Sequence, residues 1–144
     1  MPRLGLLNIT WGFLLILASA MGGVFLSYDL TEGFLKDAKL LGNWQAVLQA
    51  SAHGHTNLFG LLHIVMGLTF PYHLWSNFIK KLQTVGLGLG ALAMGPGMLW
   101  RASLGPTSSL DFNGVVLGVA FFCAFLALAS HFFGLLGKLL SRVS

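Results

Sequence analysis

Charged side chains are scarce in this sequence. They make up 8% of the 144 residues, whereas hydrophobic residues make up 56%, and the mean hydropathy is +0.80. A soluble domain carries about 25% charged residues, so this chain has too few charges to cover a surface that faces water. A membrane-spanning helix needs about 20 apolar residues. The length therefore predicts four spans with their loops and leaves no room for a separate soluble domain.

Cysteine and intramembrane carboxylates are also lacking. Cys123 is the single cysteine, so a disulfide within the chain is excluded, and we interpret it as a small buried hydrophobe. The four acidic residues all lie outside the predicted spans. A zinc hydrolase needs three or four ligands or a His-Glu-x-x-His helix, and neither pattern is present.

Clustered basic residues are missing as well. The net charge is only +4, and the lysines and arginines are scattered along the chain. A nucleic-acid-binding protein needs a dense basic stripe that can neutralise phosphates, so no nucleic acid is expected as a partner. We interpret the basic residues as anchors at the surface of a lipid membrane.

Long apolar runs are what the sequence does contain. They predict an all-α, integral membrane four-helix bundle that forms a single membrane domain over 1–144, with spans at about 6–28, 50–74, 82–100 and 112–136. The first run is too long for a signal peptide, so we interpret it as a span. The polar stretch between the first two spans, Asp29 to Gln49, is predicted to be a long loop.

Glycine is concentrated in the third predicted span. Small residues let helices approach closely in lipid, so we expect this span to lie against its neighbours at Gly86, Gly88, Gly90, Gly95 and Gly97. Pro96 stands between the last two of these glycines. A proline inside a helix removes one hydrogen bond and clashes with the preceding turn, which predicts a kink or a break there.

The basic residues also predict the orientation. One side of the predicted bundle carries Arg3, Lys80, Lys81, Lys138 and Arg142, and the other carries Lys36, Lys39 and Arg101 with all four acids. Cytoplasmic loops carry an excess of lysine and arginine. We therefore expect both termini in the cytoplasm and a multi-pass protein of a bacterial inner membrane.

Three histidines, His53, His55 and His63, enter the second predicted span within eleven residues. Titratable side chains are costly in a bilayer and by default suggest function. His53 and His55 are about 200° apart around a helix, so they face nearly opposite ways unless the helix is unwound. His53, Asn57 and Gly60 share one face, and we expect the missing side chain of Gly60 to leave room for a flat ligand.

Haem is a flat cofactor that needs one or two protein side chains as axial ligands of its iron, together with an apolar cleft. His53 is our first choice for the iron ligand and His55 the second. Arg101, near the outer face, is expected to pair with haem propionates. His63, near the bilayer midplane, and His131, in the fourth span, are either further ligands or hydrogen-bonded packing residues, and His73 is interpreted as an interfacial anchor.

From about Trp44 to Ser103 the sequence resembles the styrene oxide isomerase family. These are four-span membrane proteins that form trimers and bind haem b. The resemblance rests on spacings in the second span and shortly after it, namely Ala52-His53, Leu58, Gly60, Pro71, Lys80-Lys81, Gly86 and Ser103.

The resemblance implies a homotrimer in which His53 ligates the iron of haem b between neighbouring subunits. It further implies that ferric iron acts as a Lewis acid on the epoxide of a small hydrophobic molecule from the bilayer, which rearranges to a carbonyl. At the two substrate-facing positions of the family this sequence has Phe59 in place of asparagine and Trp100 in place of tyrosine. Asn57 lies close by, and Trp100 keeps an N–H donor.

Two alternatives remain open from the residues. The run His-x-His-x-x-Leu-x-Gly, beginning at His53, also resembles the haem-bearing helix of small relatives of haem–copper oxidase subunit I. That hypothesis predicts a bis-histidine b-type cytochrome, for electron transfer or binding of a diatomic gas, with His63 or His131 as second ligand. The other alternative is a non-enzymatic membrane protein whose histidines hydrogen-bond between helices.

Overall fold

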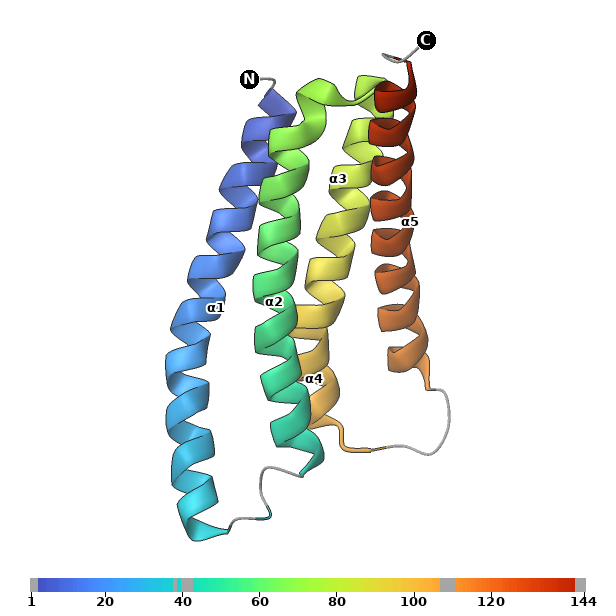
Figure 1. Cartoon of the computed structure of the whole chain (residues 1–144). Coiled ribbons are helices and arrows are strands. Elements are labelled where there is room, and N and C mark those ends of the chain that lie inside the picture. The colour runs from blue at the N-terminus through green and yellow to red at the C-terminus, as the bar shows by residue number, and fades with distance from the viewer. Residues whose placement is uncertain (1–2, 38, 40–42, 107–110, 142–144) are drawn as a thin grey trace.

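The computed structural model describes residues 3–37, 39, 43–106 and 111–141, and the secondary structure of these residues is helical. The elements are α1 (Arg3–Lys36), α2 (Trp44–Thr69), the 3-10 turn η2 (Phe70–Tyr72), α3 (Asn77–Leu92), the π-helical turn η3 (Ala93–Gly97), α4 (Met98–Ser103) and α5 (Phe112–Leu140). Because α3, η3 and α4 follow one another without a break, the chain forms four long rods (Figure 1). The predicted all-α fold is confirmed.

Three of the rods are long and apolar enough to cross a membrane, namely Arg3–Lys36, Asn77–Ser103 and Phe112–Leu140. This finding favours a membrane protein, as the composition predicts. Helix α2 is not among them, because histidine, glutamine and asparagine side chains interrupt its apolar sequence. Its 26 residues nevertheless give it a length of roughly 39 Å, and it lies alongside the other rods (Figure 1).

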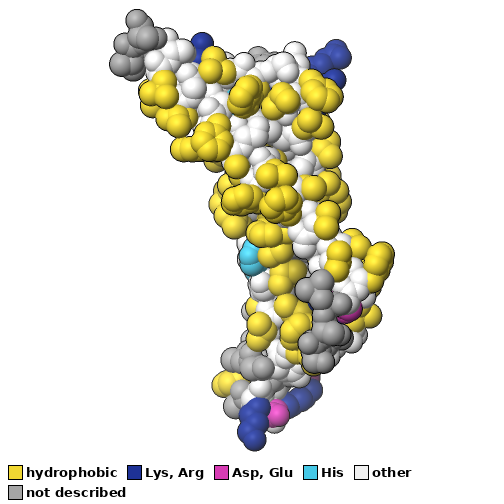
Figure 2. Space-filling model, turned by 90° about the vertical axis from the view of Figure 1, so that its right-hand side faces the viewer, with side chains coloured by type: hydrophobic (Ala, Val, Ile, Leu, Met, Phe, Trp, Pro, Cys, Tyr) yellow, Lys and Arg dark blue, Asp and Glu magenta, His cyan; other side chains and the backbone are white. Residues whose placement is uncertain are grey.

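The rods pack in the order α1, α2, α3 with α4, and α5, so α1 and α5 form the two outer edges. The most apolar stretches of α1 and α5 are each 11% buried, against 44% in Asn77–Ser103. The apolar side chains of the edge helices therefore face outwards. Figure 2 shows such side chains spread over the middle of one face. In a membrane protein these surfaces meet lipid or another protein chain.

The predicted loop from Asp29 to Gln49 is wrong over most of its length. Helix α1 continues to Lys36, which pairs with Glu32 one turn earlier. Helix α2 already begins at Trp44, where the side-chain oxygen of Asn43 accepts a hydrogen bond from the Gln45 backbone N–H at 3.0 Å. Polar residues can continue a helix whose surface is exposed. The charged residues from Asp29 onwards therefore mark the end of the apolar stretch and not the end of helix α1.

The Gly95-Pro96-Gly97 segment does not break the third rod. The chain passes Pro96 in the π-helical turn η3 and continues as α4. A π turn widens the helix by one residue, which accommodates a proline that has no N–H to donate. A Cβ atom on Gly97 would lie 3.0 Å from the Leu92 carbonyl oxygen and would clash with the Leu117 side chain of α5.

Helices α1 and α2 approach most closely along a line of glycines, which we call the glycine seam: Gly5 and Gly12 on α1, and Gly60 and Gly67 on α2. A Cβ on Gly12 would lie 2.5 Å from the Gly60 carbonyl oxygen, and a Cβ on Gly67 would lie 2.5 Å from the Gly5 carbonyl oxygen. Both pairs are seven residues apart in the sequence, a spacing that keeps contacts on one face of two packed helices. The next positions along this line are Ser19 and His53, which hydrogen-bond each other.

The two ends of the molecule differ in charge. The described basic residues Arg3, Lys80, Lys81 and Lys138 lie at the end that carries both termini and the turn between α2 and α3, and Arg142 lies outside the described residues. The four acids lie towards the opposite end, with the end of α1 and the start of α5. The predicted separation of charges between the two ends is thus confirmed for the residues that the structure describes.

Substitution of one glycine of the seam tests this packing. Gly60→Ala places a methyl group 2.7 Å from Ile16 Cγ1 and 2.9 Å from the Gly12 carbonyl oxygen. We expect it to lower the free energy of unfolding by about 1–3 kcal/mol, as overpacking does. In the control Gly88→Ala the new methyl group meets no atom within 4 Å. We expect that variant to be neutral or slightly more stable; equal losses in thermal unfolding of the two purified variants would contradict the seam.

Candidate functional site

Helix α2 is intact through its first two histidines, and their side chains point to different neighbours. The Nδ1 atom of His53 lies 3.0 Å from the Ser19 hydroxyl oxygen on α1. The Nδ1 atom of His55 lies 2.8 Å from the Ser51 carbonyl oxygen, and the Ser51 hydroxyl donates to the Met98 sulfur on α4. The two histidines therefore face different sides, as the spacing predicts, and do not converge on one ion.

The hydrogen bonds of Ser19 determine which nitrogen of His53 carries the proton. Ser19 lies 3.0 Å from both the His53 carbonyl oxygen and His53 Nδ1. Since a carbonyl oxygen only accepts and the hydroxyl has a single hydrogen, Ser19 donates to the carbonyl and Nδ1–H donates to Ser19. The lone pair of neutral His53 is therefore on Nε2. Nε2 has no hydrogen-bond partner among the described residues, and it is not among the fully buried atoms that lack one.

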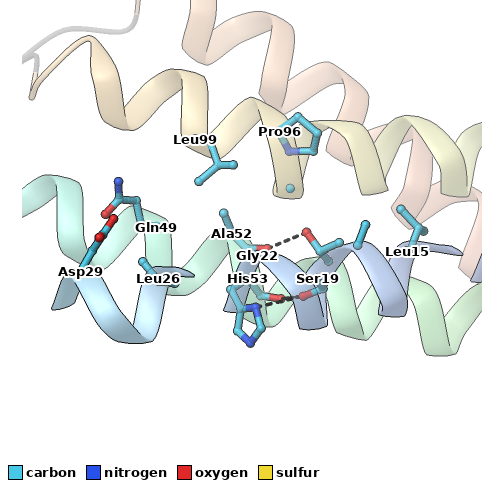
Figure 3. A pocket seen from close by; sticks show the side chains of 13 residues that line it. Leu15, Ser19, Gly22, Leu26, Asp29, Gln49, Ala52, His53, Pro96 and Leu99 are labelled. Atoms are coloured by element: carbon cyan, nitrogen blue, oxygen red, sulfur yellow. Dashed lines mark hydrogen bonds between the residues drawn. The ribbon is translucent and has the colours of Figure 1, made fainter. Parts of the chain in front are cut away.

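The His53 ring rests against the α1 backbone at a glycine. A Cβ on Gly23 of α1 would lie 2.5 Å from His53 Cε1, so only glycine allows the ring to rest there. Cβ atoms on Gly22 and Gly54 would meet no described atom within 4 Å. In Figure 3 the His53 ring points away from Pro96 and Leu99. The His53 ring thus lies on the outer side of the α1–α2 pair.

The space expected at Gly60 is filled by α1. The place that a Gly60 side chain would take lies 2.9 Å from the Gly12 carbonyl oxygen and 2.7 Å from Ile16 Cγ1. The expectation of room for a flat ligand at this position is therefore wrong, because the missing side chain serves helix packing instead. Asn57, between His53 and Gly60 on the helix, is half-buried.

The two positions suggested as substrate-facing lie apart from His53. Phe59 is 3% exposed and belongs to the hydrophobic core with Met66 and Leu87. A Cβ on Gly90 of α3 would lie 2.7 Å from its ring, so α2 and α3 pack closely there. Trp100 is on α4 and is 45% exposed. The structure does not bring these two side chains to one place.

His63 belongs to a buried polar network that joins three helices. His63 Nδ1 donates to Asn8 Oδ1 at 2.8 Å, and the Asn8 amide donates to the Thr84 hydroxyl and the Leu4 carbonyl, each at 2.9 Å. The Nε2 atom of His63 is buried without a partner among the described residues. Asn8 was not among our site candidates, although an amide inside an apolar run is costly in a bilayer and was therefore a usable signal.

His131 and His73 form a second polar cluster near the turn between α2 and α3. Their rings stack with centroids 4.5 Å apart. His131 Nε2 lies 2.8 Å from the Thr69 hydroxyl, and His73 Nε2 donates to the His131 carbonyl at 2.9 Å. From His53 to Thr69 helix α2 rises roughly 24 Å. Neither His63 nor His131 therefore faces His53 within one chain.

Arg101 has partners within the chain. Its guanidinium lies 3.7 Å from the Asp111 carboxylate, donates to the Gly105 carbonyl at 2.8 Å and stacks 5.2 Å above the Trp44 ring. Asp111 also caps α5, where its carboxylate accepts from the Gly114 N–H at 2.7 Å. Arg101 therefore joins the starts of α2 and α5, and its charge is already matched by Asp111.

A groove of about 390 Å³ lies on the other side of His53, between α1, α2 and the η3–α4 turn (Figure 3). Its walls are mainly apolar, and its lining also includes the polar residues Ser19, Asp29, Gln49, Thr56 and His53, the last with its ring turned away from the groove. The first four of these were not among the predicted site residues. They become neighbours only through the packing of helices, so no spacing within the sequence indicated them. Among the described residues, no three His, Cys, Asp or Glu side chains cluster as metal ligands.

The assigned proton positions can be tested by ¹⁵N NMR of labelled histidine rings. We expect Nδ1–H in His53, His55 and His63, because each Nδ1 faces an oxygen that accepts. His73 should carry Nε2–H, because that atom faces a carbonyl. Ser19→Ala should mix the two forms of His53 and leave His63 unchanged. An Nε2–H form of His53 in the unsubstituted protein would contradict the assignment.

Comparison of the chain with protein-family models, with curated proteins and with solved structures found no match in any of the three.

Proposed function

We propose that the protein is a four-span membrane protein of a bacterial inner membrane, with both termini in the cytoplasm. Three rods have the length and composition of spans, and α2 packs against α1 on one side and α3 and α4 on the other. This packing shields the polar groups of α2 from lipid, as an intramembrane histidine requires. The basic residues at the end with both termini support the orientation.

We further propose that the protein binds haem b through His53 Nε2. The observation that carries this proposal is the hydrogen bond of His53 Nδ1 to Ser19. A histidine that ligates a metal commonly donates its other N–H to an oxygen, which sets the tautomer and the ring orientation. Haem needs a single protein nitrogen and room for a flat ring, and the His53 ring points away from the groove of its own chain, towards the outer side of the α1–α2 pair.

The direction in which His53 faces supports a homotrimer. The His53 ring points outwards rather than into the groove of its own chain, and the adjacent apolar surface of α1 is largely exposed. A large apolar cofactor at this surface needs a second wall, which a neighbouring subunit would provide. Arg101 is less suited to hold propionates than expected, since Asp111 and Trp44 already hold its guanidinium.

The chemistry proposed is the rearrangement of an epoxide to a carbonyl in a small hydrophobic molecule drawn from the bilayer. When bound, haem b supplies a ferric Lewis acid for an epoxide oxygen. The chain contributes the His53 ligand, an apolar surrounding that excludes water, and the half-buried Asn57 amide as a polar group on the same helix face. No acidic side chain lies within the apolar part of α2, which suits a rearrangement that needs no strong general base.

The b-type cytochrome is the alternative, and it requires a second ligand. Because His63 and His131 are turned to other partners within the chain, a second histidine would have to come from another subunit. A purely structural role describes His63, His73 and His131 well, since each hydrogen-bonds between elements. It does not account for His53 Nε2, which has no hydrogen-bond partner among the described residues.

An absorption spectrum of the detergent-purified protein, with a pyridine haemochrome assay, tests the cofactor. We expect a Soret band, about one haem per chain and high-spin ferric iron. His53→Ala should abolish the band, whereas the matched control His55→Ala should retain it, because the His55 ring is held by Ser51 of its own helix and does not share the face of His53. Low-spin iron would indicate the bis-histidine cytochrome instead. Protein that stays colourless after expression with added haem would reject both haem proposals.

The trimer can be tested by native mass spectrometry. We expect three chains and three haem groups in one particle, and we expect His53→Ala to remain a trimer without haem if the protein contacts suffice. A monomer with a full haem content would contradict the proposed position of the cofactor between subunits.

A further inference from the structure

The groove beside α2 has an apolar body and a polar mouth. Leu15, Leu26, Pro96 and Leu99 line its length. Figure 3 shows Asp29 and Gln49 at one end and Leu15 at the other, with Pro96 and Leu99 facing Ala52 across the groove. A molecule that fills this space needs an apolar part along the helices and one polar group at the mouth.

The hydroxyl groups in the groove can only accept hydrogen bonds from a ligand. The Thr56 hydroxyl donates to the Ala52 carbonyl at 2.7 Å, and the Ser19 hydroxyl donates to the His53 carbonyl at 3.0 Å. Each hydroxyl has one hydrogen, so only lone pairs remain. At these two positions the groove therefore favours a ligand group that donates.

The charge at the mouth of the groove further restricts the class of ligand. Asp29 is exposed at the groove, and the two ion pairs among the described residues join other groups, Lys36 to Glu32 and Arg101 to Asp111. Asp29 is therefore a carboxylate without a described basic partner. A carboxylate repels an anionic ligand and attracts a cation.

We propose that this groove binds a lipophilic primary amine, with its alkyl part between the helices and its ammonium group at Asp29 and Gln49. Such an ammonium resembles that of lysine, whose ordinary pKa is about 10.4, so it is charged at neutral pH and has three N–H donors. The site uses the groove side of α2 and not His53 Nε2, so it does not depend on haem.

Titration calorimetry of the full chain in phosphatidylcholine nanodiscs tests the site. Octylamine, octanol and octanoate are the probes, and empty nanodiscs give the background of partition into lipid. We expect saturable binding of octylamine at one per chain, roughly fivefold weaker binding of octanol, which is the effect of about 1 kcal/mol from a partly exposed charge pair, and no binding of octanoate.

Four variants separate the groove from surface charge. Asp29→Asn should weaken octylamine roughly fivefold to the level of octanol, and Asp29→Lys should reverse the preference in favour of octanoate. Leu99→Trp should abolish binding of all three probes by filling the groove. The matched control Asp37→Asn removes an acid at the same end of the molecule but outside the groove, and should leave octylamine binding unchanged.

Three results would overturn the proposal. Octanol that binds as tightly as octylamine would show a groove without charge recognition. Equal losses in Asp29→Asn and Asp37→Asn would indicate attraction by the acidic end as a whole. Unchanged octylamine binding in Leu99→Trp would place the ligand elsewhere.

Discussion

Helices α1 and α2 approach one another so closely that the backbone of each lies against the other. This contact positions Ser19 beside His53 and forms one wall of the groove. The glycine seam brings the carbonyl oxygens of Gly5 and Gly60 within reach of the opposite helix. At the next position along the same line Ser19 and His53 replace glycine and hydrogen-bond instead. If α1 and α2 were farther apart, Ser19 and His53 would separate, the His53 ring would lose its fixed orientation and the groove would widen. Helix packing and ligand geometry therefore depend on the same small residues.

The polar groups of α2 follow from one constraint, that a polar atom without a partner is costly where water is absent. His53, His55 and His63 each direct Nδ1 to an oxygen of the protein, so the lone pair of each ring lies on Nε2. The surroundings of the three Nε2 atoms then differ. That of His63 is buried without a partner, whereas those of His53 and His55 are not. His53 differs from His55 in that its Nδ1 is held by a neighbouring helix, through Ser19, and not by its own helix.

Opposite sides of the α1–α2 pair serve the two proposals. The outer side carries the His53 ring, where a neighbouring subunit would complete the proposed cofactor site. The inner side, towards the η3–α4 turn, forms the groove with its acceptors and Asp29. Pro96 belongs to the inner side alone, where the π turn around it brings Gly95 against Thr56 and lets the third rod line the groove.

The sequence by itself determined the all-helical fold, the apolar rods, the separation of charge between the ends and the opposite directions of His53 and His55, because these follow from composition and from the helical repeat. The prediction from sequence was wrong about the length of the first loop and about the role of Gly60. A glycine that leaves room for a ligand and a glycine that lets a helix pack closely cannot be distinguished from sequence alone. Only the tertiary structure decided that Ser19 orients His53, that Asn8 holds His63 and that Asp29 and Gln49 line the same groove. These pairs lie on different helices, and the depth at which two helices pack brings them together.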